Sequence, residues 1–412
     1  MMLNKSSIQR LQLSNFKLNS LLEITQSINQ NLSTISLLRR YEKILRVDLN
    51  IGRVMIFSFN QKEWECILES GIENEYYDAD ELVKNSLSKF EDISYVTSSS
   101  AFQFKGFDIV IPVYQNDIVI AYVLIGDIDE EREGVSPTIK HLKFIQTITN
   151  VIVVAIENKR LYKESIVQAA FKKELELASK MQAMLIPTND AFPKNNHLRV
   201  ASYYSPHSEV GGDYYDFIRL NKEEYGFCIA DVSGKGMAAA ILMSNFQASL
   251  RALFTSKIEL PAIINRLNES IMNNAKGEKF ITFFIGKYNG KTRKLNYVNA
   301  GHNPPVYYNS KTKKTEFLSL GCFGLGMFDD IPNIIEGVVE INAGDKVICY
   351  TDGLSEAENP EQDELGTLPI EECIVTKQSI SVIIETLKNK MKTFIKEQPV
   401  SDDVSILGIE FS

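Results

Sequence analysis

Acidic residues in the second half of the chain stand where apolar runs meet turns, and folding alone does not explain them. They are Asp213, Asp231, Asp352 and Asp402. An ionised carboxylate beside a protein core costs on the order of several kcal/mol unless a cation or hydrogen-bond donors compensate it. The whole chain has only 4 histidines. Because acidic residues are present at these turns and histidines are few, the sequence predicts metal sites with oxygen ligands, which hard divalent cations prefer.

The stretch around Asp231 shows how one of these carboxylates is positioned. An apolar strand ends at Asp231-Val232, a turn with Gly234 and Gly236 follows, and a helix of small residues begins near Met237. We expect the two glycines to let the backbone approach bound ions or a substrate closely, because a side chain there would crowd them.

The elements that carry these turns lie after Pro187, which disfavours helical backbone in the residue before it. From there on, short apolar runs alternate with turns, and three helical stretches intervene at 237–254, 260–274 and 380–397. Because strands and helices do not alternate regularly, an α+β sandwich over residues 191–412 is favoured over a doubly wound sheet.

The N-terminal part, 1–158, predicts a separate α/β domain. Apolar residues recur at helical spacing from Leu18 to Leu45, with a break at Ser33-Thr34. Two apolar runs flank a polar turn at 115–117 and predict a hairpin over 112–126. This pattern, over about 15–158, resembles a GAF domain, which implies a sensor for a small-molecule or protein signal. A scaffold that dimerises without any ligand is the alternative.

Residues 159–190 predict a helical linker between the two domains. A helix is expected from Pro137 to about Leu185, and its charged part keeps a narrow apolar seam that includes Tyr162 and Ile166. Such a seam is typical of a helix that packs against a copy of itself. We therefore expect a coiled-coil-like signalling helix in a homodimer, with a solvated single helix as the alternative.

Composition limits the class of protein. The net charge of -9 and the absence of a long basic block argue against nucleic-acid or anionic-membrane partners. The 5 scattered cysteines fit a reducing compartment. No apolar run approaches the ~20 residues that span a bilayer, so we expect no membrane association and a cytoplasmic location.

Several motifs in order give a sharper indication. They are Ala178 to Pro187, Val210 to Asp216, Asp231 to Gly236, Asn299 to Pro305, Tyr350 to Gly353, and Ser401 to Ser405. Together they resemble the metal-dependent PPM protein phosphatases, specifically the bacterial SpoIIE- and RsbU-type serine phosphatases. The resemblance implies an αββα sandwich of two antiparallel sheets with a metal cleft at one end.

The same resemblance implies a ligand set for two divalent cations, Mn²⁺ or Mg²⁺. Asp231 would bridge them, the backbone carbonyl of Val232 would add a ligand, and Asp213 would hold one ion directly or through water. Asp352 and Asp402 would complete the other site, with Asp403 as second choice to Asp402. Asp216 is expected to be structural or to support the ligands from outside the metal site. Two cations offset the repulsion between a nucleophile and the phosphate anion.

One departure concerns the general acid. Eukaryotic relatives carry a His after the glycine of an Asp-Gly-His turn, whereas Ser233-Gly234 stands here. His302 is the only histidine inside a family motif, and we expect it to have a structural role in its turn.

The resemblance also implies a substrate and a circuit. The substrate would be a phosphoserine or phosphothreonine on a STAS-domain anti-anti-sigma factor, in a partner-switching pathway for stress response through sigma factor regulation. Two other functions compete with this one. The Gly211-Gly212-Asp213 turn is similar to that of diguanylate cyclases, although Tyr214 stands where a second acid is expected. The phosphatase fold could also serve as an inactive binding module.

Overall fold

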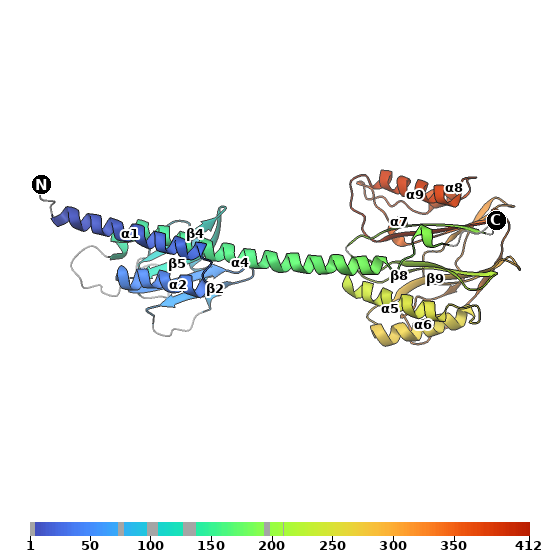
Figure 1. Cartoon of the computed structure of the whole chain (residues 1–412), viewed down its shortest axis with the longest axis horizontal. Helices are drawn as coiled ribbons and strands as arrows, with labels where there is room; N and C mark the ends of the chain where they lie inside the picture. The colour runs from blue at the N-terminus through green and yellow to red at the C-terminus, as the bar shows by residue number, and fades with distance from the viewer. Residues whose placement is uncertain (1–4, 73–77, 97–105, 127–136, 193–197, 209) are drawn as a thin grey trace. The chain divides into compact units, whose positions relative to one another are not determined.

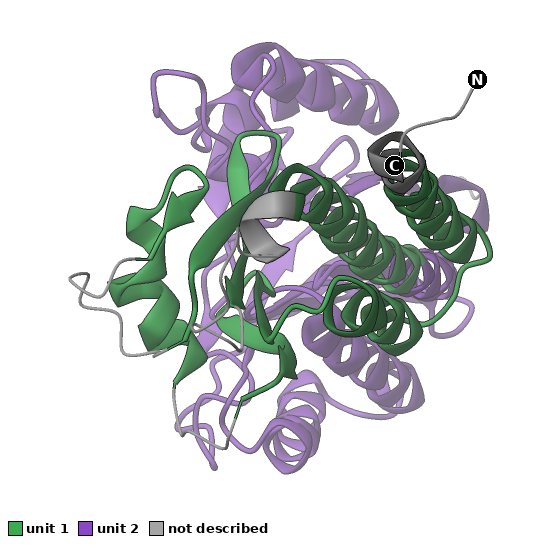
Figure 2. Cartoon of the chain, turned by 90° about the vertical axis from the view of Figure 1, so that its left-hand side faces the viewer, with its two compact units in different colours: residues 1–169 green, residues 170–412 purple. Residues whose placement is uncertain are grey.

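The computed structural model describes residues 5–72, 78–96, 106–126, 137–192, 198–208 and 210–412. They fall into two compact units, 1–169 and 170–412 (Figure 2). The division lies inside helix α4 (Pro137–Ala183) and inside the predicted linker. The last turns of this helix therefore belong to the second unit.

The first unit is built on a five-stranded antiparallel sheet of order β2-β1-β5-β4-β3. Its strands are β1 (Arg53–Phe59), β2 (Trp64–Ser70), β3 (Ser94–Tyr95), β4 (Ile109–Gln115) and β5 (Ile118–Gly126). Its helices, besides the first part of α4, are α1 (Lys5–Asn29), α2 (Thr34–Lys43), a π-helical turn (Ile44–Asp48), α3 (Ala79–Asn85) and a 3-10 turn (Leu87–Lys89).

Both faces of this sheet are covered because side chains alternate along β1. Val54 and Ile56 face a core formed with α1, α2 and α4. Met55 and Phe57 face a smaller core that includes residues of α3. A sheet that is apolar on both faces, with helices on each, accounts for the continuous apolar runs in the sequence.

Two local predictions for this unit are confirmed. The break between the first two helices falls where Ser33 caps α2, its hydroxyl accepting a hydrogen bond from the Ser36 N–H at 3.2 Å. The hairpin of β4 and β5 turns at Asn116 and Asp117, which have φ of 49° and 64°. Such left-handed pairs fit the twist of two-residue hairpins.

The second unit contains two antiparallel-type sheets packed face to face. The six-stranded sheet has the order β13-β10-β9-β8-β7, with β14 also pairing with β10, and its one parallel pair is β10 with β13. Its strands are β7 (Tyr214–Arg219), β8 (Glu224–Val232), β9 (Ile281–Asn289), β10 (Lys294–Ala300), β13 (Gly321–Cys322) and β14 (Gly337–Glu340).

The five-stranded sheet has the order β12-β11-β15-β16-β6. Its strands are β6 (Leu198–Ser205), β11 (Val306–Asn309), β12 (Lys314–Phe317), β15 (Lys346–Tyr350) and β16 (Val404–Phe411). One buried core joins the two sheets, since it includes Phe284 of β9 together with Cys349 of β15 and Leu407 of β16.

Helices cover the outer face of each sheet, which completes four layers (Figure 1). The pair α5 (Met237–Leu253) and α6 (Leu260–Ala275) lies on the six-stranded sheet. The pair α8 (Leu368–Ile374) and α9 (Ile380–Ile395) lies on the five-stranded sheet. Short helices complete the unit, a 3-10 turn (Asn189–Ala191) and α7 (Asp352–Ser355). The unit is thus a mixed α+β sandwich, in agreement with the fold predicted for it.

Among the residues described, no helix is long and apolar enough to cross a membrane.

Candidate metal centre

Strand register brings the predicted carboxylates to one end of each sheet. In the first sheet, Tyr214 at the start of β7 pairs with Ala230 near the end of β8, so Asp213 and Asp231 lie at the same end. In the second sheet, Tyr350 at the end of β15 pairs with Ile406 near the start of β16, and Asp352 and Asp402 flank this pair. Antiparallel pairing therefore gathers residues that are up to 189 positions apart, from 213 to 402.

The turn after Asp231 is held in place by Phe280, the residue immediately before β9. The Ser233 N–H donates to the Phe280 carbonyl at 2.9 Å, and the Phe280 N–H donates to the Ser233 hydroxyl at 2.9 Å. Gly234 and Gly236 both have φ of 78°. A side chain at Gly236 would meet no protein atom within 4 Å, so no contact within the chain requires glycine there, and crowding of bound ions or a substrate stays a prediction. The left-handed backbone by itself favours glycine.

Asp213 is 1% exposed and is held by a hydroxyl from the other sheet. Thr351 donates to its Oδ2 at 2.8 Å, while the Thr351 oxygen accepts the Ser405 N–H at 2.9 Å. Thr351 is itself completely buried. This threonine fixes the orientation of the carboxylate, and it is a positioning residue that sequence reasoning missed although it lies next to Asp352.

Asp402 and Asp403 have different surroundings. Both oxygens of Asp403 accept backbone N–H groups, one from His207 at 2.7 Å and the other from Gly212 at 2.6 Å. The Asp402 carboxylate is partly exposed and forms an ion pair with Lys235 at 3.0 Å. Asp403 therefore shapes the turn before Asp213, and this contrast favours Asp402 as the residue available to a cation.

Asp216 and His302 have the structural roles that we expected. Asp216 is completely buried and accepts hydrogen bonds from the Tyr214 hydroxyl at 2.6 Å and from Arg251 Nε at 2.8 Å. The two ring nitrogens of His302 contact the Thr282 hydroxyl at 2.9 Å and the Tyr350 carbonyl at 3.1 Å. Burial lowers the pKa of His302 to about 4.

The electrostatics of the cluster match a cation site. Burial raises the pKa of Asp231 to about 7, and repulsion from Asp352 and Asp402 adds to this rise. Burial and the charge of Asp231 also raise the pKa of Asp213 well above its ordinary value. The pKa of Asp352 is raised by burial and by Asp402. The negative charges of these carboxylates repel one another, and a bound cation would relieve that repulsion.

The donor chemistry also fits a divalent cation. A side chain placed on Gly212 would lie 3.0 Å from the Val232 carbonyl oxygen and 3.5 Å from Asp231 Oδ1, so glycine keeps these two oxygens accessible. Within the described ranges, no three acidic, histidine or cysteine side chains converge as a ready-made metal cage. The fit therefore rests on oxygen donors and charge, and coordination would need small side-chain movements.

The end of α4 reaches this site through Gln182, which is buried. Its Nε2 donates to the Gly211 carbonyl at 2.6 Å, and its Oε1 accepts the Gly211 N–H at 3.0 Å. This paired contact holds the glycine turn immediately before Asp213. Nothing in the spacing of the sequence identifies Gln182, because its partner lies 29 positions away.

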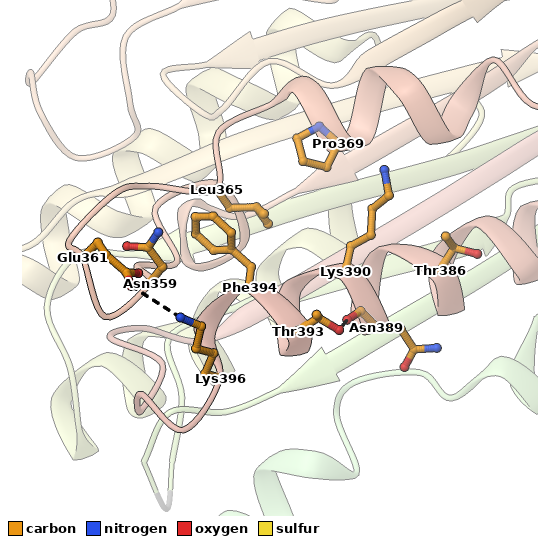
Figure 3. Close-up of a pocket in the computed structure, with 10 residues that line it drawn as sticks. All are labelled: Asn359, Glu361, Leu365, Pro369, Thr386, Asn389, Lys390, Thr393, Phe394 and Lys396. Atoms are coloured by element: carbon orange, nitrogen blue, oxygen red, sulfur yellow. Dashed lines mark hydrogen bonds and ion pairs between the residues drawn. The ribbon is translucent and has the colours of Figure 1, made fainter.

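A cavity of about 710 Å³ lies elsewhere in the second unit, between the 359–365 loop and helices α8 and α9 (Figure 3). Phe394 and Leu365 form an apolar wall, and an ion pair between Lys396 and Glu361, 3.4 Å long, lies at one side. None of the predicted acidic residues lines it. The cavity is therefore separate from the carboxylate cluster.

Comparisons with known proteins cover this second unit. Residues 221–412 match the family described as stage II sporulation protein E (SpoIIE). The phosphoserine phosphatase RsbU of Bacillus subtilis is 28% identical over 245 residues, which are 58% of this chain and 71% of RsbU. The phosphoserine phosphatase RsbP of the same organism is 25% identical over 187 residues, 44% of this chain and 45% of RsbP.

A solved structure supports the fold. The SiaA-PP2C domain of Pseudomonas aeruginosa superposes with a TM-score of 0.52 at 18% identity, covering 60% of this chain and 99% of that domain. At this identity the likeness concerns the fold alone, and it agrees with the two packed sheets and their helical layers.

Proposed function

We propose that the protein is a metal-dependent phosphatase of phosphoserine or phosphothreonine in proteins, from the premise that the second unit, whose residues 221–412 match the SpoIIE family, is a phosphatase domain of that family. One observation carries the proposal. Acidic residues from four separate strand ends meet at one end of the sandwich, and burial together with mutual repulsion raises the pKa of Asp231 to about 7. Such a cluster has a clear use in holding cations.

In this proposal Asp213, Asp231, Asp352 and Asp402 would hold two divalent cations, Mn²⁺ or Mg²⁺, with the Val232 carbonyl as a further ligand and Asp403 as a supporting residue. Divalent cations in such a site lower the pKa of water and neutralise charge on phosphate oxygens.

The protein's own groups at the site orient the proposed ligands and offset the charge of the phosphate. The hydroxyl of Thr351 fixes one oxygen of Asp213, and the Gln182 amide fixes the turn before it. The exposed ammonium of Lys235 contacts Asp402 and can attract the phosphate dianion. His302 does not act as the proton donor, since both its ring nitrogens are engaged and its pKa is low.

The substrate that we propose is a phosphorylated STAS-domain protein in a partner-switching pathway that controls a sigma factor. Support comes from two relatives, RsbU and RsbP, which are named phosphoserine phosphatases. We further propose that the first unit is a GAF-like sensor, that the chain works as a homodimer in the cytoplasm, and that α4 transmits the signal. The contact between Gln182 and Gly211 supports the last point.

The decisive experiment is a phosphatase assay of the full chain with Mn²⁺ against a panel of phosphoserine STAS-domain proteins. We expect phosphate release that EDTA abolishes and Mn²⁺ restores. Asp231→Asn should reduce the rate by about 100-fold or more, because it removes a proposed direct ligand, and even outer contacts of metal ligands are worth about 10- to 100-fold.

Two results would contradict this function. Production of a cyclic dinucleotide from GTP and Mg²⁺ would assign the protein to the cyclases. Binding of STAS-domain proteins without any phosphate release, at all Mn²⁺ concentrations tested, would make the second unit a binding module.

A further inference from the structure

The second unit presents a cluster of exposed, ordered apolar side chains. They are Phe280, Phe323, Met327 and Phe328, which are 38%, 54%, 41% and 46% exposed. We call them the apolar rim. The rings of Phe323 and Phe328 meet edge to face with centroids 5.1 Å apart. A side chain added at Gly324 would lie 2.9 Å from the Met327 methyl group, so Met327 folds over this glycine.

The loop that carries the rim is fixed by buried hydrogen bonds. Asn268 of α6, which is 3% exposed, donates to the carbonyls of Phe328 and Asp329 at 2.9 and 3.0 Å and accepts the Gly326 N–H at 2.8 Å. Leu325 and Ile281 exchange two backbone bonds of 2.8 Å. Side chains held on a rigid backbone lose little entropy when a partner covers them.

The rim adjoins the turn of the candidate metal centre. Ile281 pairs with Val232 in the sheet, and both backbone groups of Phe280 bond to Ser233, two residues after Asp231. The loop therefore reaches the carboxylate cluster through one bonded segment, Phe280-Ile281. Anything docked on the rim lies beside the turn that follows Asp231.

Positive charge lies between the rim and the carboxylates. Lys279 precedes Phe280 in the chain, and its half-buried ammonium donates to the Ser233 carbonyl at 2.8 Å. Lys235 lies in the same turn and pairs with Asp402. The surface thus offers an apolar contact next to two cations, which complements a protein that carries a phosphate beside apolar side chains.

We propose that the apolar rim is the docking surface for the folded phosphoprotein substrate, whose apolar side chains cover Phe323 and Phe328 while its phosphoserine enters the carboxylate cluster. This inference rests on the proposed phosphatase function. Exposed aromatic residues that are rigidly held are typical contact residues of protein interfaces. A second copy of this chain fits less well, because it would cover the turn at Ser233 beside the carboxylates and hinder access of the phosphoprotein.

The test compares a large and a small substrate. In the full chain, the double variant Phe323→Ser with Phe328→Ser removes the rim but leaves every backbone bond of the loop. The substrates are the phosphoserine STAS-domain protein that the wild type hydrolyses best and p-nitrophenyl phosphate. The control is Leu368→Ser on α8, which removes a 65% exposed apolar side chain away from the rim.

We expect kcat/KM for the phosphoprotein to fall about tenfold or more through KM, with kcat/KM for p-nitrophenyl phosphate unchanged and the control equal to wild type. Equal losses on both substrates would overturn the inference, and so would an unchanged KM for the phosphoprotein. Loss of a dimer in sedimentation, with unchanged KM, would assign the rim to a second copy. Failure of the wild type on both substrates would instead refute the proposed function itself.

Discussion

The contact between Gln182 and Gly211 offers a direct test of how the end of α4 supports the candidate metal centre. Gln182→Met keeps the length of the side chain but removes both the donor and the acceptor of its amide. The Gly211 N–H and carbonyl would then lose their partners in a buried position. Each unsatisfied group costs about 1 to 3 kcal/mol.

The lower end of that range gives about 2 kcal/mol for the two groups together. If the turn moves so that these two groups find other partners, the position of Asp213 that suits the cation becomes less favourable by this energy. At about 1.4 kcal/mol per factor of ten, affinity for Mn²⁺ would then fall by about 30-fold. If the turn stays in place, the same energy appears as lower stability, about 4 to 8 °C in Tm for a unit of this size.

Isothermal titration with Mn²⁺ and thermal unfolding of the full chain separate these outcomes. Lys180→Met is the matched control, because Lys180 is exposed on the same helix two residues earlier. We expect weaker Mn²⁺ binding in Gln182→Met and no change in the control. A variant that binds Mn²⁺ within about twofold of wild type, whatever its Tm, would refute a positioning role for Gln182.

Three further changes test other contacts. Thr351→Val removes the hydroxyl that donates to Asp213, so titration should show Mn²⁺ affinity reduced by about tenfold, while Thr351→Ser should restore it; an unaffected valine variant would disprove the contact's role. His302 has a pKa of about 4 when folded and 6.5 ordinarily, so its contribution, about 3 kcal/mol, is complete above pH 6.5 and is lost as pH falls towards 4. Urea unfolding across this range should show a steeper loss in wild type than in His302→Gln, and parallel curves would contradict burial of a neutral ring. Gly353→Ala would place a methyl group 2.1 Å from the Asp403 carbonyl and should lower stability by about 1 to 3 kcal/mol in the same assay, whereas a wild-type curve would show that the loop yields freely.

The sequence was sufficient to predict the elements that carry the site. Asp213 and Asp231 stand next to apolar strands. Carboxylates in such positions indicate a function, because an ionised carboxylate beside the core does not stabilise the fold. The pairing that unites them with Asp352 could be inferred only from the family resemblance, since strand order depends on contacts between distant segments. The structure supports that inference through the register of β7 with β8 and of β15 with β16.

The difference between Asp402 and Asp403 could not be predicted from their positions alone. Adjacent residues in extended backbone point to opposite sides, but the sequence does not say which side meets backbone N–H groups. His207 and Gly212 decide this, because they donate to Asp403 and leave Asp402 to Lys235.

The residue type alone also did not reveal why glycine stands at position 236. The residue type indicated a special backbone or a close contact, and both explanations fit a turn. The structure shows the special backbone, with a left-handed φ and no protein atom within 4 Å of an added side chain, whereas close contact with a bound ion or substrate stays a prediction.

The assignment of the last turns of α4 to the second unit has an evolutionary consequence. Gln182 bonds to the turn before Asp213, and Ile186 joins the core of that unit. Recombination that exchanges the first unit can therefore join upstream of Ala170 and keep the second unit whole. A junction at 191 would discard both residues. Exchange of the first unit should accordingly leave the final turns of α4 as an inherited part of the gene segment that encodes the second unit.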